Sequence, residues 1–515
     1  MTDTLQAPDA DQSTGPVDSP RPQPAASGSG GDSSRQWRSL WRMHFYAGMF
    51  AIPFMLLMAT TGLVILYTQP IHDALEGDVR TVARGTQTVS YDEQAQAVET
   101  AYPDLPVLYM ITPPDDHHAT AFGVDDGANE VYVDPYTGEV LGKIDAGGGI
   151  VGLANRLHGF FNNETFTVSL PTVSALWDGE AVMRPYVVSD LVLEVLGVWT
   201  IVLMVTGLYL WMPRRSRNGG DARNGRGWFS LRLQKKGRAR WRDLHGLSGL
   251  VMIPVLALTI VSGMGWSTYW GPNFGSLADK LTPGNPVDPP TSEVATRGDL
   301  DRLGNRITWN TGDRPIPASY APAADVTMPA PVSLDTVTAI ADDEGMLPGY
   351  TVFFPTNATD EQGAPTFGAF TMSNSWPRKT GEARDLSIDQ FTGETLTDQT
   401  AYGLGTIGYG MDVLVSTHMG TQLGIVSRIF MTLLCVLAIW SSISALIMFT
   451  KRRRPGTLGL PKRPADVRLS GRVKLVGVTL GVLFPQWAAT ALVILGFDRF
   501  LIRRVRPLRL AFGQR

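Results

Sequence analysis

Long apolar stretches without charged residues are the feature that most limits how this chain can fold. Several of them exceed the roughly 20 residues that an α-helix needs to cross a bilayer core of about 30 Å. They cover residues 45–71, 195–213, 244–278, 429–450 and 475–497 of the 515-residue chain. The chain is therefore predicted to be an α-helical membrane protein with four to five spanning helices. The single cysteine, Cys435, leaves no disulfide framework.

Basic clusters flank the first four stretches and predict the orientation of the chain. They occupy residues 35–42, 214–242 and 451–454. The positive-inside rule places all three in the cytoplasm and the two long intervening segments outside. The tail after the fifth stretch carries six arginines and breaks this pattern, so Pro485 leaves two possibilities, a fifth spanning helix or a re-entrant hairpin.

These cues divide the chain into segments. Residues 1–34 are rich in Pro, Ser, Gly and Asp and are predicted to be a disordered tail. No cleavable signal peptide is expected, so the first helix would direct membrane insertion. The expected segments are helix 35–71, external α+β domain 72–186, helix 187–213, basic cytoplasmic loop 214–242, helix 243–271, external α+β domain 272–417, helix 418–450, basic loop 451–471, helix or hairpin 472–498 and basic tail 499–515.

The chain also repeats itself. HFYAGMFAIPFMLLMATTG (44–62) and HGLSGLVMIPVLALTIVSG (245–263) are identical at six of nineteen positions. YVDPYTGEVLG (132–142) and LSIDQFTGETL (386–396) share D-x-[YF]-T-G-E, in which glycine suits a turn between strands. A stretch with helix-compatible spacing and a strand-like stretch precede each turn. They cover 91–101 with 107–112, and 333–342 with 350–354. An internal duplication is predicted, each copy holding two spanning helices and one small α+β domain.

Four of the seven histidines occupy matching positions in the two copies. His44 and His245 open the first and third helices at the cytoplasmic edge, and His158 and His418 precede the second and fourth at the external edge. Folding the copies around a pseudo-two-fold axis would bring His44 to His245 and His158 to His418. Two imidazoles from facing helices can ligate haem iron axially, and two such sites stacked across a bilayer would form an electron path.

Other interpretations of the histidines are open. A histidine at a membrane edge is commonly an interfacial residue or a helix cap. Zinc competes with haem, although two histidines without a paired cysteine or carboxylate are few ligands for it. His72, His117 and His118 have no counterpart in the repeat, and His117 and His118 are expected to be solvated in an external loop. Gly62 shares a helix face with His44, because residues 18 apart align after five turns, and would leave room for a flat group.

Charged residues near the histidines are further candidates. Glu194 interrupts the second apolar stretch, and we expect it to accept the free N–H of an outer histidine or to relay protons. Arg428 and Arg42 are candidate partners for haem propionates. A structural Glu194–Arg428 ion pair, or snorkelling to the membrane surface, is the competing expectation.

Some motifs are absent from the sequence. It holds no dinucleotide-binding G-x-G-x-x-G between a strand and a helix, no P-loop and no nucleophile elbow. Electrons would therefore come from a quinol or a separate cytoplasmic reductase, and no nucleic-acid partner is expected. No catalytic side chain can be named.

The order of these motifs resembles the PepSY-associated transmembrane family of bacterial inner-membrane proteins, from about 35 to 510. The motifs are R-x-H (42–44), L-H (157–158), VTGLYLWMPRR (205–215), L-H-G (244–246), H-x-G (418–420) and the D-x-[YF]-T-G-E turns. The ending LIMFTKRRR (446–454) departs from the Trp-rich ending expected there.

Members of this family are similar to ferric-siderophore reductases. The resemblance implies two periplasmic PepSY-like domains and two haem b groups with His44, His158, His245 and His418 as axial ligands. It also implies an inner-membrane protein with a cytoplasmic N-terminus that reduces a ferric siderophore or another iron chelate in the periplasm. Two rival hypotheses stay open: a non-catalytic PepSY module that binds and restrains partner proteins, and a proton-coupled transporter that uses Glu194 and the histidines.

Overall fold

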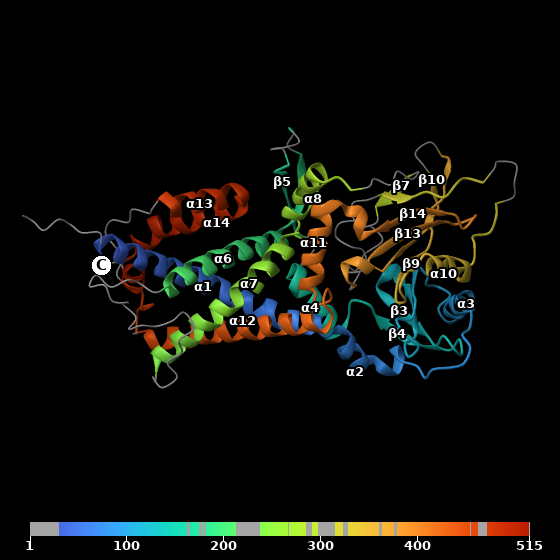
Figure 1. Ribbon diagram of the computed structural model, residues 1–515, viewed down its shortest axis with the longest axis horizontal. Coiled ribbons are helices and arrows are strands. Elements are labelled where there is room, and N and C mark those ends of the chain that lie inside the picture. The colour runs from blue at the N-terminus through green and yellow to red at the C-terminus, as the bar shows by residue number, and fades with distance from the viewer. Residues whose placement is uncertain are drawn as a thin grey trace, which may run out of the picture.

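The computed structural model of the chain is elongated, with a helical bundle at one end and a β-sheet at the other (Figure 1). The structure describes residues 30–161, 165–174, 179, 182–212, 237–265, 267–284, 291–296, 315–322, 328–359, 363–374, 378–453, 455–461 and 471–513. Most of the predicted tail 1–34 and of the basic segment 214–242 lies outside the described residues.

Four helices in the described part of the chain are long and apolar enough to cross a membrane, as predicted. They are α1 (Gly30–Leu66), α6 (Val188–Trp211), α7 (Arg238–Met264) and α12 (Ile425–Arg452). They form a ring in which α1 contacts α6 and α12, and α7 contacts the same two helices. The ring therefore has the two-fold arrangement expected of a duplicated pair of helices. We call the end where α1 and α7 begin the basic end, because Arg42 lies there, and the opposite end the sheet end.

Shorter helices lie toward the sheet end. α4 (Gly149–Phe160) contacts α1, and α11 (Gly405–His418) makes the equivalent contact with α7. α2 (Thr68–Arg80) follows α1, and α8 (Trp270–Leu281) follows α7. Three small hairpins complete this region: β5 (Thr167–Pro171) with β6 (Met183–Val187), β7 (Thr291–Thr296) with β8 (Pro315–Pro317), and β10 (Ala358–Thr359) with β11 (Pro365–Thr366).

One antiparallel sheet of eight strands contains both predicted α+β units, in the order β14-β13-β12-β9-β1-β2-β3-β4. The first copy supplies β1 (Tyr109–Ile111), β2 (Thr120–Val124), β3 (Asn129–Val133) and β4 (Val140–Asp145). The second supplies β9 (Thr351–Phe353), β12 (Ala369–Ser373), β13 (Arg384–Asp389) and β14 (Thr395–Thr400). β1 and β9 join the copies, with Met110 opposite Val352.

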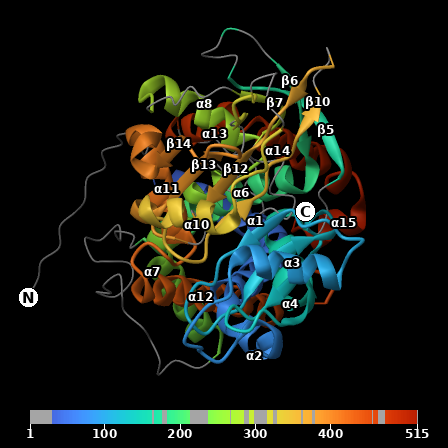
Figure 2. The same cartoon turned by 90° about the vertical axis from the view of Figure 1, so that its right-hand side faces the viewer.

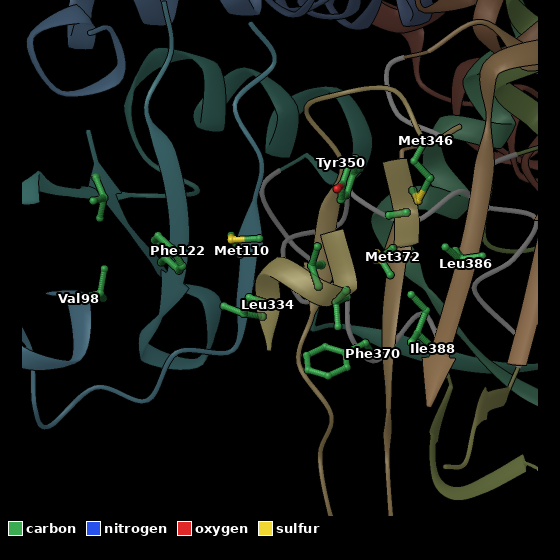
Figure 3. Packing of buried hydrophobic residues seen from close by; sticks show 14 of the residues in the cluster. Val98, Met110, Phe122, Leu334, Met346, Tyr350, Phe370, Met372, Leu386 and Ile388 are labelled. Atoms are coloured by element: carbon green, nitrogen blue, oxygen red, sulfur yellow. The ribbon is translucent and has the colours of Figure 1, made fainter. Parts of the chain in front are cut away.

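The two predicted α+β units therefore share one sheet and one core. Val98, Met110 and Phe122 of the first copy and residues such as Leu334 and Met372 of the second form one buried cluster (Figure 3). Each unit alone would leave β1 or β9 as an unpaired edge strand beside apolar side chains, and joining them removes both edges.

Two helices of the sheet region also cap each other across the copies. α3 (Tyr91–Ala101) and α10 (Leu334–Asp343) lie side by side in front of the sheet (Figure 2). Asp335 accepts from the backbone N–H of Tyr91 at 3.0 Å, and Asp92 accepts from the backbone N–H of Leu334 at 3.1 Å. Each carboxylate thus satisfies a free N–H group at the start of the other copy's helix.

The two T-G-E turns have the predicted form. They connect β3 to β4 and β13 to β14, and Gly138 and Gly393 each take a φ of 74°. Asp134 accepts from the backbone N–H of Tyr136, and Asp389 accepts from that of Phe391, each at 2.8 Å. A positive φ is readily adopted only by glycine, which explains the shared glycine.

The fifth apolar stretch forms two helices, α13 (Gly471–Leu483) and α14 (Pro485–Phe497), followed by a π-helical turn (Asp498–Ile502) and α15 (Arg506–Ala511). A helix of 13 residues is about 20 Å long, too short to span a core of about 30 Å. α13 and α14 pack side by side (Figure 1), and Trp487 of α14 contacts Trp199 of α6 at 5.6 Å between ring centroids. The chain then returns to the basic end, where Arg42 donates to the carbonyl of Phe512 at 3.0 Å.

Candidate functional site: two facing histidine pairs

The four histidines of the repeat form two pairs. His44 of α1 faces His245 of α7, and their ring centroids lie 6.4 Å apart at an interplanar angle of 77°. His158 of α4 faces His418 of α11, also at 6.4 Å and at 78°. The predicted pairing in space is confirmed, and the near-identical geometry reflects the duplication. We call them the basic-end pair and the sheet-end pair.

The two pairs lie far apart along the bundle. His158 approaches Thr61, which follows His44 by 17 residues on the same helix. At 1.5 Å per residue this corresponds to about 25 Å along α1. That length is close to the bilayer core of about 30 Å, so one pair lies toward each end of the membrane-spanning region.

Each imidazole makes a hydrogen bond through Nδ1. His44 contacts Thr206 Oγ1, His158 contacts Thr61 Oγ1 and His418 contacts Ser262 Oγ, each at 2.9 Å, and His245 contacts the backbone oxygen of Ser441 at 3.1 Å and Ser444 Oγ at 3.2 Å. All partners come from the same copy as the histidine. Each copy therefore builds its own half of both pairs.

The hydrogen-bond network favours one position for the ring proton. The hydroxyls of Thr206, Thr61 and Ser262 donate their hydrogens to carbonyls of the preceding helical turn, at 2.6, 2.8 and 3.0 Å. The oxygen of each hydroxyl can then accept a hydrogen bond from Nδ1–H of its histidine. The carbonyl of Ser441 can only accept, so the same holds for His245. Every group in this network has a partner when Nδ1 carries the proton, and that tautomer leaves the Nε2 lone pair free as a ligand.

Glycines allow three of the rings to approach the helices closely. A Cβ built on Gly207 would lie 3.1 Å from Cε1 of His44, and one on Gly62 would lie 3.3 Å from Cε1 of His158. The equivalent distance from Gly263 to His418 is 3.7 Å. The glycine that closes each repeat therefore borders a histidine of the sheet-end pair.

Sequence reasoning missed the hydroxyl residues, although a signal for them was present. Thr61-Gly62, Thr206-Gly207 and Ser262-Gly263 are all a hydroxyl residue followed by glycine near the end of a spanning helix. Ser444-Ala445 is the matching small pair in α12.

A comparison with protein families bears on the whole arrangement. A family model described as "PepSY-associated TM region" matches residues 41–452. The chain belongs to this family. The matched range of the PepSY-associated TM region includes α1 from residue 41, the other three spanning helices, the sheet and both histidine pairs, and it ends before the α13–α14 hairpin. A search of curated proteins finds no match.

Glu194 has a different position from the one predicted. Its buried side chain accepts from the backbone N–H groups of Tyr269 and Trp270 at 2.9 and 3.0 Å, where α8 begins, and from the amide of Gln486 in α14. The predicted bond to an outer histidine is replaced by the hydroxyls described above, and the alternative ion pair with Arg428 is not formed. A buried carboxylate at a helix N-terminus meets N–H groups that have no partner within the helix.

The two candidate arginines differ in what they contact. The buried guanidinium of Arg42 donates to the carbonyls of Pro461 and Phe512 at 2.9 and 3.0 Å, and so holds the C-terminal segment against α1. Arg428 is half-buried, its backbone lies close to Gly420, and among the described residues its guanidinium has no hydrogen bond or ion pair.

The histidines outside the repeat contact acidic residues. His72 lies 3.0 Å from Glu76, and His118 bonds to Asp115 at 2.7 Å and lies 3.4 Å from Asp73. Partial burial lowers the pKa of His118, but the hydrogen bonds and charges of the two aspartates outweigh it and raise the pKa. A histidine that holds its proton more tightly is a poor metal ligand.

Proposed function

We propose that this PepSY-associated membrane protein binds two haem b groups, one at each histidine pair, and passes electrons across the bacterial inner membrane to a ferric complex outside. The observation that supports this most is the pair of facing imidazoles that recurs with the same spacing at both ends of the bundle. A helix cap or an interfacial residue would not need an opposing partner at a matched distance.

The spacing of the rings suits one metal between them. A metal–imidazole bond is about 2.0 Å, and the nitrogen lies about 1.2 Å from its ring centroid, so two rings on opposite sides of one metal have centroids roughly 6.4 Å apart. The observed centroid distance is 6.4 Å in both pairs. Free Nε2 lone pairs on neutral rings are the ligand form that this arrangement requires.

The donor set favours haem over zinc. In the described part of the chain, no group of three or more His, Cys, Asp or Glu side chains converges as a metal site. A protein zinc site takes three or four such ligands, whereas haem iron needs only two axial ligands because the porphyrin supplies the others. Arg428, which is half-buried and whose backbone lies close to Gly420, is our candidate partner for a haem propionate at the sheet-end pair. Arg42 is engaged with the C-terminal segment and is a weaker candidate.

The chain's own residues would bind and orient the cofactors. A bound haem supplies one-electron redox chemistry. The imidazoles fix its position, the hydroxyls and carbonyls behind them fix the imidazoles, and the apolar ring of helices excludes water. The basic end lies in the cytoplasm by the positive-inside rule, where a quinol or a cytoplasmic reductase would deliver electrons. The sheet end lies outside, where a ferric siderophore or another iron chelate would accept them.

Spectroscopy of histidine variants tests the proposal. The purified protein, supplied with haem, is expected to show a reduced-minus-oxidised spectrum of two b-type haems. His44→Ala or His245→Ala should remove one haem, and His158→Ala or His418→Ala the other. The double variant of His44 and His158 should remove both.

His72→Ala is the matched control, because His72 pairs with Glu76 outside the two pairs. A colourless wild-type protein would contradict the proposal and favour the non-catalytic module. Loss of haem in His72→Ala equal to that in His44→Ala would contradict the assignment of the ligands. Reduction of a ferric chelate by the chemically reduced protein then tests the substrate class.

A further inference from the structure

The partners of the four histidines share one local design. In each case a hydroxyl residue of a spanning helix presents its oxygen to Nδ1: Thr61 to His158, Thr206 to His44, Ser262 to His418 and Ser444 to His245. His245 also contacts the backbone oxygen of Ser441, three residues before Ser444, at 3.1 Å. The shared design is therefore one hydroxyl behind each imidazole, with its own hydrogen donated to a carbonyl of the preceding helical turn.

The positions of these units follow the duplication. The first copy places one unit at the end of α1 and one at the end of α6, and the second copy places them at the ends of α7 and α12. In three of the four, the next residue is the glycine against which the ring lies. Serine and threonine in membrane helices commonly donate a hydrogen bond to a carbonyl of the preceding turn. This common bond does not explain why each of these four hydroxyls also contacts an imidazole.

We propose that Thr61, Thr206, Ser262 and Ser444 are positioning residues that hold each imidazole in the Nδ1–H tautomer and so set the affinity and the reduction potential of the haem bound at that pair. This inference rests on the proposed function. A hydrogen bond accepted from Nδ1–H makes Nε2 a stronger donor, and a stronger donor favours ferric over ferrous iron. Each unit belongs to one pair, so each pair can be tuned separately.

The proposal predicts a local effect of removing one hydroxyl. Thr61→Val keeps the shape of the side chain but leaves Nδ1 of His158 without its hydroxyl acceptor. The sheet-end haem is expected to bind roughly 10- to 100-fold more weakly, as is typical when a partner of a metal ligand is lost. Its midpoint potential should shift to more positive values while the basic-end haem is unchanged. Thr206→Val should weaken haem binding and raise the midpoint potential at the basic-end pair, and leave the sheet-end haem unchanged.

The haem at the basic-end pair should be less sensitive to loss of the Ser444 hydroxyl than to loss of the Thr206 hydroxyl. Nδ1 of His245 contacts the carbonyl of Ser441 at 3.1 Å, and the hydroxyls of Ser441 and Ser444 at 3.2 Å each. Ser444→Ala leaves that carbonyl in place, so the expected shift in potential is smaller than that of Thr206→Val at the same haem.

The test is to measure the haem affinity and the midpoint potentials of each variant by haem titration and redox titration. The chain also offers a closely matched control. Thr60 precedes Thr61 and also bonds to the carbonyl of the preceding turn, at 2.8 Å, but its side chain is exposed. Thr60→Val should leave both haems unchanged, and Thr61→Ser, which keeps the hydroxyl, should behave like the wild type. The haem at the unaltered pair reports that each variant is folded.

The outcomes separate this inference from the proposed function. A wild-type protein without haem would defeat the proposed function, and the inference with it. Two haems in the wild type with equal behaviour of Thr61→Val and Thr60→Val would overturn the inference alone. A shift of both haems together in Thr61→Val would overturn it as well, because the effect would then be a general change in structure.

Discussion

At the scale of single residues, the absence of a side chain matters as much as its presence. His44 and His158 lie so close to α6 and α1 that a methyl group on Gly207 or Gly62 would press on the ring carbon Cε1. Interiors are close-packed and adjust only partly to an inserted group. The small residue after each hydroxyl therefore helps to set where the imidazole points.

Substitution of Gly207 tests this close approach. Alanine normally stabilises an exposed helix by about 1 kcal/mol relative to glycine, but here its Cβ would lie 3.1 Å from the His44 ring. We expect Gly207→Ala to weaken haem binding at the basic-end pair only, as measured by haem titration. Gly477→Ala, at a position in α13 with no atom near the new methyl group, is the control and should leave both haems intact. Equal effects of the two variants would show that ring contact is not the cause.

At the scale of elements, buried carboxylates connect helices that are distant in sequence. Glu194 of α6 receives the first N–H groups of α8 and the side chain of Gln486 in α14, and Asp190, one turn earlier, receives the N–H of Thr268 at 2.6 Å. α14 follows both copies of the repeat along the chain, so its contact with α6 lies outside the duplication. Glu194 therefore helps to hold α8 and the α13–α14 hairpin against α6.

Glu194→Leu separates a structural role from a redox role. The change leaves two backbone N–H groups and an amide without their acceptor, at a cost of about 1–3 kcal/mol for each group left unsatisfied. The midpoint of thermal unfolding, followed by circular dichroism in detergent, should fall. Both haem potentials should stay unchanged, because the histidines use other acceptors. Glu99→Leu on the exposed face of α3 is the control for stability. A shift in the midpoint potential of the sheet-end haem would contradict this expectation and would support the predicted contact between Glu194 and an outer histidine.

At the scale of the whole molecule, the two copies are joined at both ends. The sheet end joins them through β1–β9 and the mutual caps of Asp92 and Asp335. The bundle joins them through the histidine pairs, each with one ring from either copy. A shift of one copy against the other would change both ring pairs, so the shared sheet stabilises the geometry of the sites.

Removal of one cap should therefore act on the opposite copy. Asp92→Ala takes the acceptor from the backbone N–H of Leu334, and loss of such a cap typically costs about 1 kcal/mol. Hydrogen exchange should become faster in the first turn of α10, which lies in the other copy. Asp104→Ala, at an exposed position, should leave that exchange unchanged. Faster exchange confined to α3 would contradict the role of Asp92 across the copies.

The sequence by itself determined the parts that depend on local pattern. Apolar length identified the four spanning helices, the D-x-[YF]-T-G-E motif identified two turns, and the repeat identified four histidines and their pairing. These features follow from hydropathy over about 20 residues, from the φ that glycine allows, and from the symmetry of a duplication.

Tertiary structure decided how distant segments meet. That β1 pairs with β9 depends on two edge strands more than 200 residues apart, and no periodicity in either strand specifies its partner. The same holds for Glu194 and Arg42, whose partners lie in α8, α14 and the C-terminal segment. A charged group in an apolar environment takes whichever donors or acceptors the packed helices bring to it, and only the assembled bundle shows which ones those are.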